Sequence, residues 1–130
     1  MYEEITEKIK ITVKPEFLDE HSDPEEKRFI WAYHVKIENN GEDTVKLVSR
    51  SWTISDSMGR VQEVRGSGVV GENPILKPGS SFEYTSGTPL NTPSGFMMGT
   101  YKMKKNNGSI FHAHIPAFSL DSPHEKGLQN

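Results

Sequence analysis

The stretch RFIWAYHVKIEN, residues 28–39, decides the fold class of this chain. Its large apolar residues recur at every second position, at Phe29, Trp31, Tyr33, Val35 and Ile37. Successive side chains of a strand point to opposite faces, so this spacing predicts a strand with one buried face. We expect Trp31, together with Trp52 further along the chain, to lie in the core.

The same period of two continues on both sides of this strand. Upstream, Ile9, Ile11 and Val13 alternate with polar residues, up to an interruption at Pro15 that an edge strand would tolerate. Downstream, NNGED (39–43) predicts a tight reversal. In TVKLVSRSWTISD (44–56) we expect Val48, Trp52 and Ile54 to point inward, while the direction of Arg50 stays open. Further strands are expected at 61–65, 80–86, 96–105 and 109–120, and turns at DSMG (56–59), GTPLNTPSG (87–95) and NNG (106–108).

These patterns predict an all-β fold of about seven short strands without a helix. Turns recur every 8 to 15 residues, which favours a single antiparallel β-sandwich of the immunoglobulin or fibronectin III kind over residues 1–130. A small barrel is the main alternative. We expect residues 1–4 and about 121–130 to be frayed, and the acidic loop at 19–27 to be disordered.

Composition narrows the function classes. The 130 residues include no cysteine, which excludes disulfides, thiolate metal sites and cysteine nucleophiles. Net charge is −3, and the densest basic group, Lys102, Lys104 and Lys105, is too small for duplex binding, so no nucleic acid is expected. The N-terminus lacks the apolar region of a secretion signal, and no apolar run is long enough to span a bilayer. The sequence therefore predicts a soluble, cytoplasmic protein with no membrane partner.

A glycine motif stands in EVRGSGVVGENP, residues 63–74. Gly66, Gly68 and Gly71 match G-x-G-x-x-G, the pattern of dinucleotide pyrophosphate sites. Such sites need a helix directly after the glycines. Pro74 and Pro78 oppose a helix there, so the motif does not predict a dinucleotide fold.

Three other interpretations of this stretch remain open. Its backbone amides could form an anion-binding concavity, with Arg65 as an additional charge. The glycines could simply permit positive φ or a bulge where a strand leaves the sheet, which we favour over the anion site. Val69 and Val70, with Ile75 and Leu76 nearby, could form an exposed patch for a partner or lie beneath the sandwich.

Other candidate sites are weaker. His112 and His114 share one face of a predicted strand, a spacing that can chelate a metal, but no third ligand follows from the sequence. Two solvent-exposed histidines are the favoured interpretation. The sequence contains no G-x-S-x-G, P-loop or H-E-x-x-H motif, so we expect no catalytic residues, no cofactor and no enzymatic activity.

From Arg50 onward the chain resembles the ApaG family. The resemblance covers nearly the whole sequence and is carried by these pieces: Arg50-x-Trp52-x-Ile54, Gly59 with Glu63-Val64, Gly68-Val69-Val70-Gly71, Pro74-x-Leu76-x-Pro78-Gly79, Tyr84-x-Ser86-Gly87, Thr92-Pro93-x-Gly95, Met97-Met98-Gly99, Tyr101 and Ile115-Pro116-x-Phe118-x-Leu120.

This resemblance implies a fibronectin III-like sandwich and no securely attached enzymatic activity. The family is named through bacterial cobalt and magnesium resistance, and similar domains in eukaryotic F-box and polymerase-interacting proteins imply a protein-binding role. We therefore expect a non-catalytic module that binds another protein and is linked only indirectly to metal resistance. The alternative is a phosphate, pyrophosphate or nucleotide binder. For either role the candidate residues are Arg65, Gly66, Gly68, Val69, Val70 and Gly71, and self-association is left open.

Overall fold

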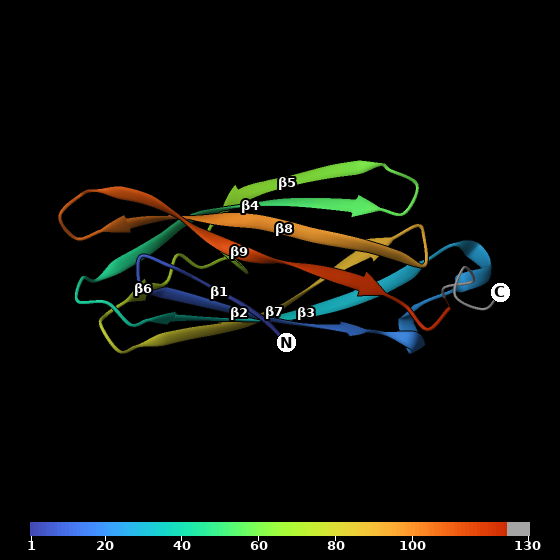
Figure 1. The fold of residues 1–130 in the computed structure, drawn as a ribbon, viewed down its shortest axis with the longest axis horizontal. Helices are drawn as coiled ribbons and strands as arrows, with labels where there is room; N and C mark the ends of the chain where they lie inside the picture. Colours follow the sequence, from blue (N-terminus) through green and yellow to red (C-terminus); the bar gives the residue numbers. More distant parts are fainter. Residues whose placement is uncertain (125–130) are drawn as a thin grey trace.

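The computed structural model describes residues 1–124 and arranges them as two antiparallel sheets packed face to face (Figure 1). The first sheet has the order β1-β2-β3-β7, and the second has the order β5-β4-β8-β9, with β6 also paired to β4. The strands are β1 (Tyr2–Thr6), β2 (Ile9–Phe17), β3 (Phe29–Asn39), β4 (Val45–Asp56), β5 (Val61–Ser67), β6 (Ile75–Leu76), β7 (Ser81–Leu90), β8 (Ser94–Lys105) and β9 (Ile110–Asp121). The all-β sandwich predicted from the sequence is confirmed.

Several details differ from the sequence expectations. Nine strands are present in residues 1–124 instead of about seven, because β1 and β6 are too short or too exposed to show a clear alternation. Of residues 1–4, which we expected to be frayed, Tyr2, Glu3 and Glu4 are instead paired with β2. The expected loop at 87–95 shrinks to three residues between β7 and β8. Asp121 ends β9 in a paired position, and residues 125–130 lie outside the described part of the chain.

The acidic segment between β2 and β3 is ordered, contrary to expectation. It forms two short 3-10 helices, η1 (Asp19–His21) and η2 (Pro24–Glu26). Asp23 and Arg28 exchange backbone hydrogen bonds of 2.8 and 2.9 Å around η2. The Ser22 hydroxyl donates to Leu18 O and accepts from the Ile30 amide. These local bonds hold a segment whose charge alone suggested disorder.

A β-bulge explains which residues of β4 face the core. Leu47 pairs with Met103 and Ser49 with Lys102, so Val48 is an extra residue on this strand. Leu47 is fully buried before the bulge, and Trp52 and Ile54 are buried after it. The prediction was correct for Trp52 and Ile54 and wrong for Val48. The extra residue at the bulge changes which alternate positions of the strand face the core, so Leu47 is buried in place of Val48.

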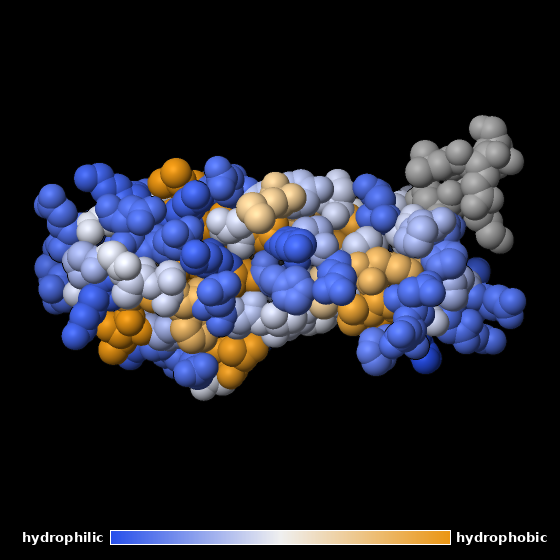
Figure 2. Space-filling model, turned by 90° about the horizontal axis from the view of Figure 1, so that it is seen from below, coloured by the Kyte–Doolittle hydropathy of each residue, from blue (hydrophilic) through white to orange (hydrophobic). Residues whose placement is uncertain are grey.

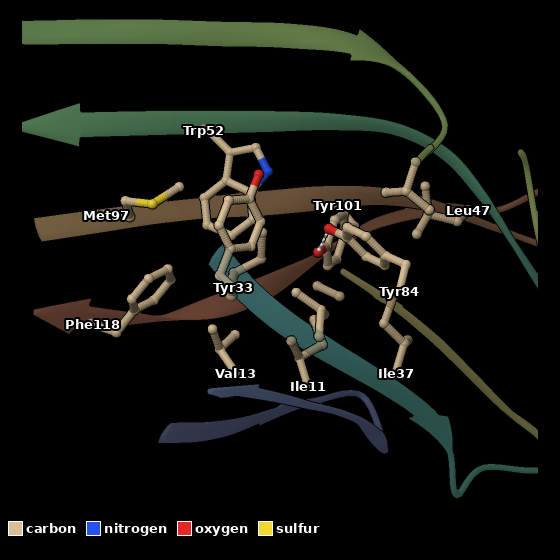
Figure 3. Packing of buried hydrophobic residues seen from close by; sticks show 14 of the residues in the cluster. Ile11, Val13, Tyr33, Ile37, Leu47, Trp52, Tyr84, Met97, Tyr101 and Phe118 are labelled. Carbon is tan, nitrogen blue, oxygen red and sulfur yellow. Dashed lines mark hydrogen bonds between the residues drawn. The ribbon is translucent and has the colours of Figure 1, made fainter. Parts of the chain in front are cut away.

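The core lies between the sheets and is rich in aromatic side chains (Figure 3). Trp52 from the second sheet packs against Tyr33 from the first, with ring centroids 5.2 Å apart. Both predicted tryptophans are buried, as are the predicted inward residues of β3. The hydroxyls of Tyr84 and Tyr101 are hydrogen-bonded to each other across the sheets. Burial raises the pKa of both tyrosines well above the ordinary value, so the pair is neutral.

The two sides of the sandwich at which the edge strands of the sheets lie are different. On one side β9 packs against β1 and β2, and the His114 amide donates to Thr6 Oγ1 at 3.1 Å. On the other side lie the edge strands β7 and β5, each paired with one neighbour in its own sheet within residues 1–124. Pro15 lies on β2 beyond the last residue paired with β1, so it occupies a local edge as its lack of an amide requires.

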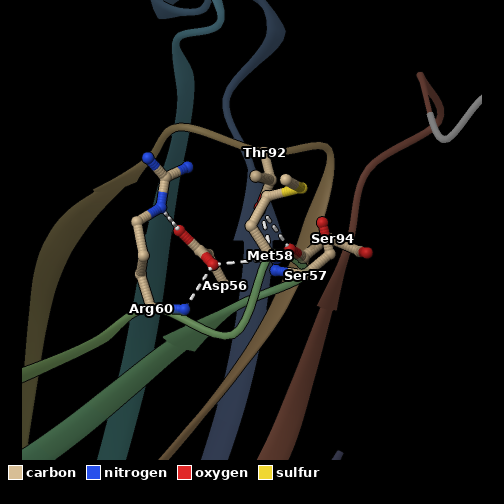
Figure 4. A network of polar contacts seen from close by, with 6 residues as sticks. All are labelled: Asp56, Ser57, Met58, Arg60, Thr92 and Ser94. Carbon is tan, nitrogen blue, oxygen red and sulfur yellow. Dashed lines mark hydrogen bonds and ion pairs between the residues drawn. The ribbon is translucent and has the colours of Figure 1, made fainter.

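A polar network closes the hairpin between β4 and β5 (Figure 4). The Asp56 carboxylate accepts hydrogen bonds from the amides of Met58 and Arg60 and from Arg60 Nε. Thr92 Oγ1 accepts from the Ser57 amide and donates to Ser94 O, which ties this turn to the β7–β8 connection. Gly59 has φ +84°, so the predicted Asp-to-Gly turn is confirmed.

The Asp56 carboxylate makes stability depend on pH. Desolvation acts to raise the pKa of Asp56, but the hydrogen bonds from Arg60 and Met58 outweigh it and hold the pKa below its ordinary value of 3.8. The stabilisation is therefore present above pH 3.8 and is lost as the pH falls through the lower folded-state pKa. We expect Asp56→Asn to be less stable than wild type in urea unfolding at pH 7, with the gap closing toward pH 2. The exposed Glu42→Gln serves as control, and an unchanged Asp56→Asn gap at low pH would contradict the prediction.

Candidate functional site

The glycine motif forms a compact corner between β5 and β6. Val69 and Glu72 exchange two backbone hydrogen bonds of 2.8 Å, which closes a four-residue turn. The two central residues both have positive φ, +43° at Val70 and +80° at Gly71. This is the type I′ pattern, in which both central residues occupy the left-handed region. After the turn the chain enters the two-residue strand β6 and not a helix, as Pro74 and Pro78 indicate.

Two of the glycines have close neighbours, and at Gly68 the neighbour is backbone that cannot easily move. A Cβ added to Gly68 would lie 2.1 Å from the carbonyl oxygen of Glu72, and its φ is +60°. A Cβ on Gly66 would lie 2.8 Å from both terminal nitrogens of Arg50. Asn73 fixes the far side of the corner, because its Nδ2 donates to the carbonyls of Leu47 and Val48 at 3.2 and 3.0 Å. These contacts are those of a packed corner.

Arg50 holds the corner from the neighbouring strand. Its guanidinium lies across Gly66, and Nη1 donates to Ser67 O at 3.1 Å and to Gly68 O at 2.9 Å. The sequence left the direction of Arg50 open and did not assign it a role. The pairing of Arg50 with Gly66 in the ladder is what creates the space for this side chain.

Three amides of the corner are already used within the fold. The Gly68 amide donates to Val48 O at 3.0 Å, and the amides of Val69 and Glu72 close the turn. These donors are not available to an anion, which favours the structural interpretation of the glycines. An anion site built from the amides of residues 66–71 stays an untested prediction, and its donor set is smaller than the motif suggests.

The apolar residues around the corner divide into two pairs. Val69 and Leu76 are 0% and 2% exposed and belong to the core. Val70 and Ile75 are 53% and 63% exposed. In the sequence neighbours Val69 and Val70, the first is buried in the core and the second faces solvent. In Ile75 and Leu76 the order is reversed. The group is therefore partly exposed and partly packed beneath the sandwich.

Exposed apolar side chains occur along this edge of the second sheet. The large hydrophobic residues that are exposed in residues 1–124 include four on the segment from the β4–β5 turn to β6, namely Met58, Val61, Val70 and Ile75. The face of the molecule in Figure 2 shows apolar side chains as separate groups among hydrophilic ones. We call β5, the Gly66–Gly71 corner and β6 together the binding edge.

The remaining candidates lie on the outer face of the second sheet. Arg65 is exposed, with Nη2 3.7 Å from Glu63 Oε2. His112 and His114 are both exposed on the outer face of β9. In residues 1–124 no group of three or more potential metal-ligating side chains comes together, so the structure adds no third ligand to this pair.

No helix in the described part of the chain is long and apolar enough to cross a membrane.

Comparison with known proteins identifies the family. A family model described as the ApaG domain matches residues 19–105. The chain belongs to the ApaG family. It is 61% identical to Protein ApaG of Rhodospirillum centenum and 60% identical to Protein ApaG of Paramagnetospirillum magneticum, in each case over 130 residues and all of both chains.

A solved structure supports the same assignment. The crystal structure of the putative ApaA protein from Bordetella pertussis is 46% identical, with a TM-score of 0.86, covering 89% of this chain and 94% of that one. The resemblance to the ApaG family seen in the sequence is therefore confirmed, and the sandwich described above is the fold of a solved relative.

Proposed function

We propose that this chain is a non-catalytic module that binds another protein through the binding edge. The observation that carries the proposal is the presence of exposed apolar side chains along this edge, at Val61, Val70 and Ile75. Exposed apolar side chains that share one edge of a sheet can form a protein interaction site.

The backbone of β5 supports the same role. Within residues 1–124, β5 pairs with β4 alone, so its outer edge carries unpaired amides and carbonyls. An extended segment of a partner can add to such an edge as a further strand, with side-chain pockets providing specificity. Val61 and Val70, at the start of β5 and just beyond its end, would then contact apolar side chains of that segment.

The conformation of Val70 points to selection for something other than stability. A β-branched residue at φ +43° costs about 1–2 kcal/mol relative to its ordinary conformations. Asn followed by Gly is the favoured pair for this turn, and Gly71 is already in place. An exposed valine at this position lowers the stability of the turn while presenting an apolar side chain at the binding edge.

Val70→Asn separates stability from binding. The substitution creates an Asn-Gly type I′ turn, so we expect the free energy of unfolding to rise by about 1 kcal/mol. The same change removes the apolar side chain, so we expect partner capture from a lysate of the source organism to fall. Urea unfolding measures the first effect, and quantitative mass spectrometry of the captured proteins measures the second.

Ile5→Asn provides the matched control, because Ile5 is an exposed aliphatic residue on β1, away from the binding edge. It should leave partner capture unchanged. Hydrogen–deuterium exchange should show slower exchange of the β5 amides in the complex than in the free protein. Equal capture by wild type and Val70→Asn, with β5 exchange unaltered, would reject the binding edge.

The proposal keeps two further expectations from the sequence. A connection with cobalt and magnesium resistance would be indirect, through the bound partner, because the His112 and His114 pair lacks a third ligand in residues 1–124. The cytoplasmic location remains part of the proposal.

A further inference from the structure

The outer face of the second sheet carries a groove that the binding edge does not include. The groove has a volume of about 370 Å³ and crosses β5, β4, β8 and β9. Its lining residues are Ser49, Arg50, Ser51, Arg65, Gly66, Thr100, Lys102 and His112. Small-molecule sites in proteins occupy roughly this size or more.

The ladder register places the polar side chains of the groove in two rows. Arg65 lies opposite Ser51, which lies opposite Thr100. In the next row Ser49 lies opposite Lys102, which lies opposite His112. Three nitrogen-bearing side chains therefore surround three hydroxyl groups on the two central strands. Because β4 and β8 each have a neighbour on both sides, this floor is rigid.

The charged side chains that line the groove are basic, although the whole chain has a net charge of −3. None of the eight lining residues is acidic. Lys46 and Lys104 lie directly opposite each other beyond the second row, a like-charge cross-strand pair that destabilises the sheet. The Glu63 carboxylate lies beside the groove, with its Oε2 3.7 Å from Arg65 Nη2. A local loss of stability such as the Lys46–Lys104 repulsion is typical of binding sites.

We propose that this groove binds the phosphate chain of a small molecule that carries a di- or triphosphate group. Arg65 and Lys102 supply two positive charges from opposite sides of the groove, and His112 supplies a ring N–H. Arginine can grip two phosphate oxygens at once, and the hydroxyls of Ser49, Ser51 and Thr100 can donate to others. The apolar residues Phe96 and Met98 further along β8 make this face a poor match for a long nucleic acid backbone.

This site differs from the anion site that the glycine motif suggested. It uses side chains on the outer face, whereas three amides of the glycine corner donate within the fold. Arg65 is the one residue common to both candidate anion sites, because its side chain lines the groove. The proposal is independent of protein binding at the binding edge, and its test uses a different readout.

Titration of the isotope-labelled full chain with inorganic pyrophosphate and triphosphate, followed by NMR, tests the proposal. We expect the amide signals of residues 49–51, 65, 100, 102 and 112 to shift, with affinity falling as salt is raised. Arg65→Gln and Lys102→Gln should each weaken binding about tenfold. Glu63→Gln frees the Arg65 guanidinium and should tighten binding about twofold to threefold.

Lys36→Gln on the first sheet is the control for net charge and should leave the affinity unchanged, because Lys36 lies on β3, away from the groove. The proposal is overturned if shifts are confined to residues 68–71, if no signal moves at millimolar pyrophosphate or triphosphate, or if Lys36→Gln weakens binding as much as Lys102→Gln. Binding of a single-stranded oligonucleotide without binding of either phosphate probe would also overturn it.

Discussion

Trp52→Ala is expected to lower the free energy of unfolding by about 3–5 kcal/mol, as measured by urea denaturation. Trp52 is 2% exposed and joins the two sheets, contacting Tyr33 from the first and Phe118 and Tyr101 from the second. Alanine would leave a large cavity at the centre of this aromatic cluster, because strands fixed by ladder hydrogen bonds can close only part of it.

Trp52→Phe is the matched control for this prediction. The indole Nε1 of Trp52 is buried without a hydrogen-bond partner in the described residues, so the ring gains no polar contact that phenylalanine would lose. Phenylalanine keeps much of the aromatic packing and removes the unpaired donor. We expect its loss to be less than half that of alanine. A loss for Trp52→Ala below about 1.5 kcal/mol would show that the sheets are not held together at this point.

The sequence predicted the fold class well because period-two burial is a local property. In β3 every predicted inward residue is buried, and β8 likewise buries Met97, Tyr101 and Met103. Strict alternation fails where the ladder contains an irregularity. In β9 the pairing shifts between Ile115 and Phe118, so the inward positions change parity, as they do around Val48 in β4. A bulge depends on the partner strand, which a period-two pattern does not identify.

The candidate site was predicted only in part, for a related reason. The sequence identified Arg65 and the glycine corner, and it indicated that no helix follows. It could not show that Arg50 covers Gly66, since these residues meet only through the β4–β5 pairing. It also could not assemble the groove, because Arg65 on β5 is far along the chain from the β8–β9 hairpin that carries Lys102 and His112.

Gly68→Ala is expected to destabilise the protein by about 2–5 kcal/mol through two separable effects. Its φ of +60° costs an alanine about 1–2 kcal/mol. In addition the new methyl group would lie 2.1 Å from Glu72 O, an atom that accepts the Val69 hydrogen bond in the turn. Backbone must therefore move, and overpacking of this kind costs about 1–3 kcal/mol more. Urea unfolding measures the total.

Gly71→Ala isolates the first effect from the second. Gly71 has a similarly positive φ of +80°, but no atom lies within 4 Å of an added Cβ. We expect this variant to lose only the conformational term of about 1–2 kcal/mol. The difference between the two variants then measures how rigidly the corner is packed between Val48 and Glu72. If the two substitutions cost the same, the corner yields without resistance, and the close contact at Gly68 does not explain why glycine is needed there.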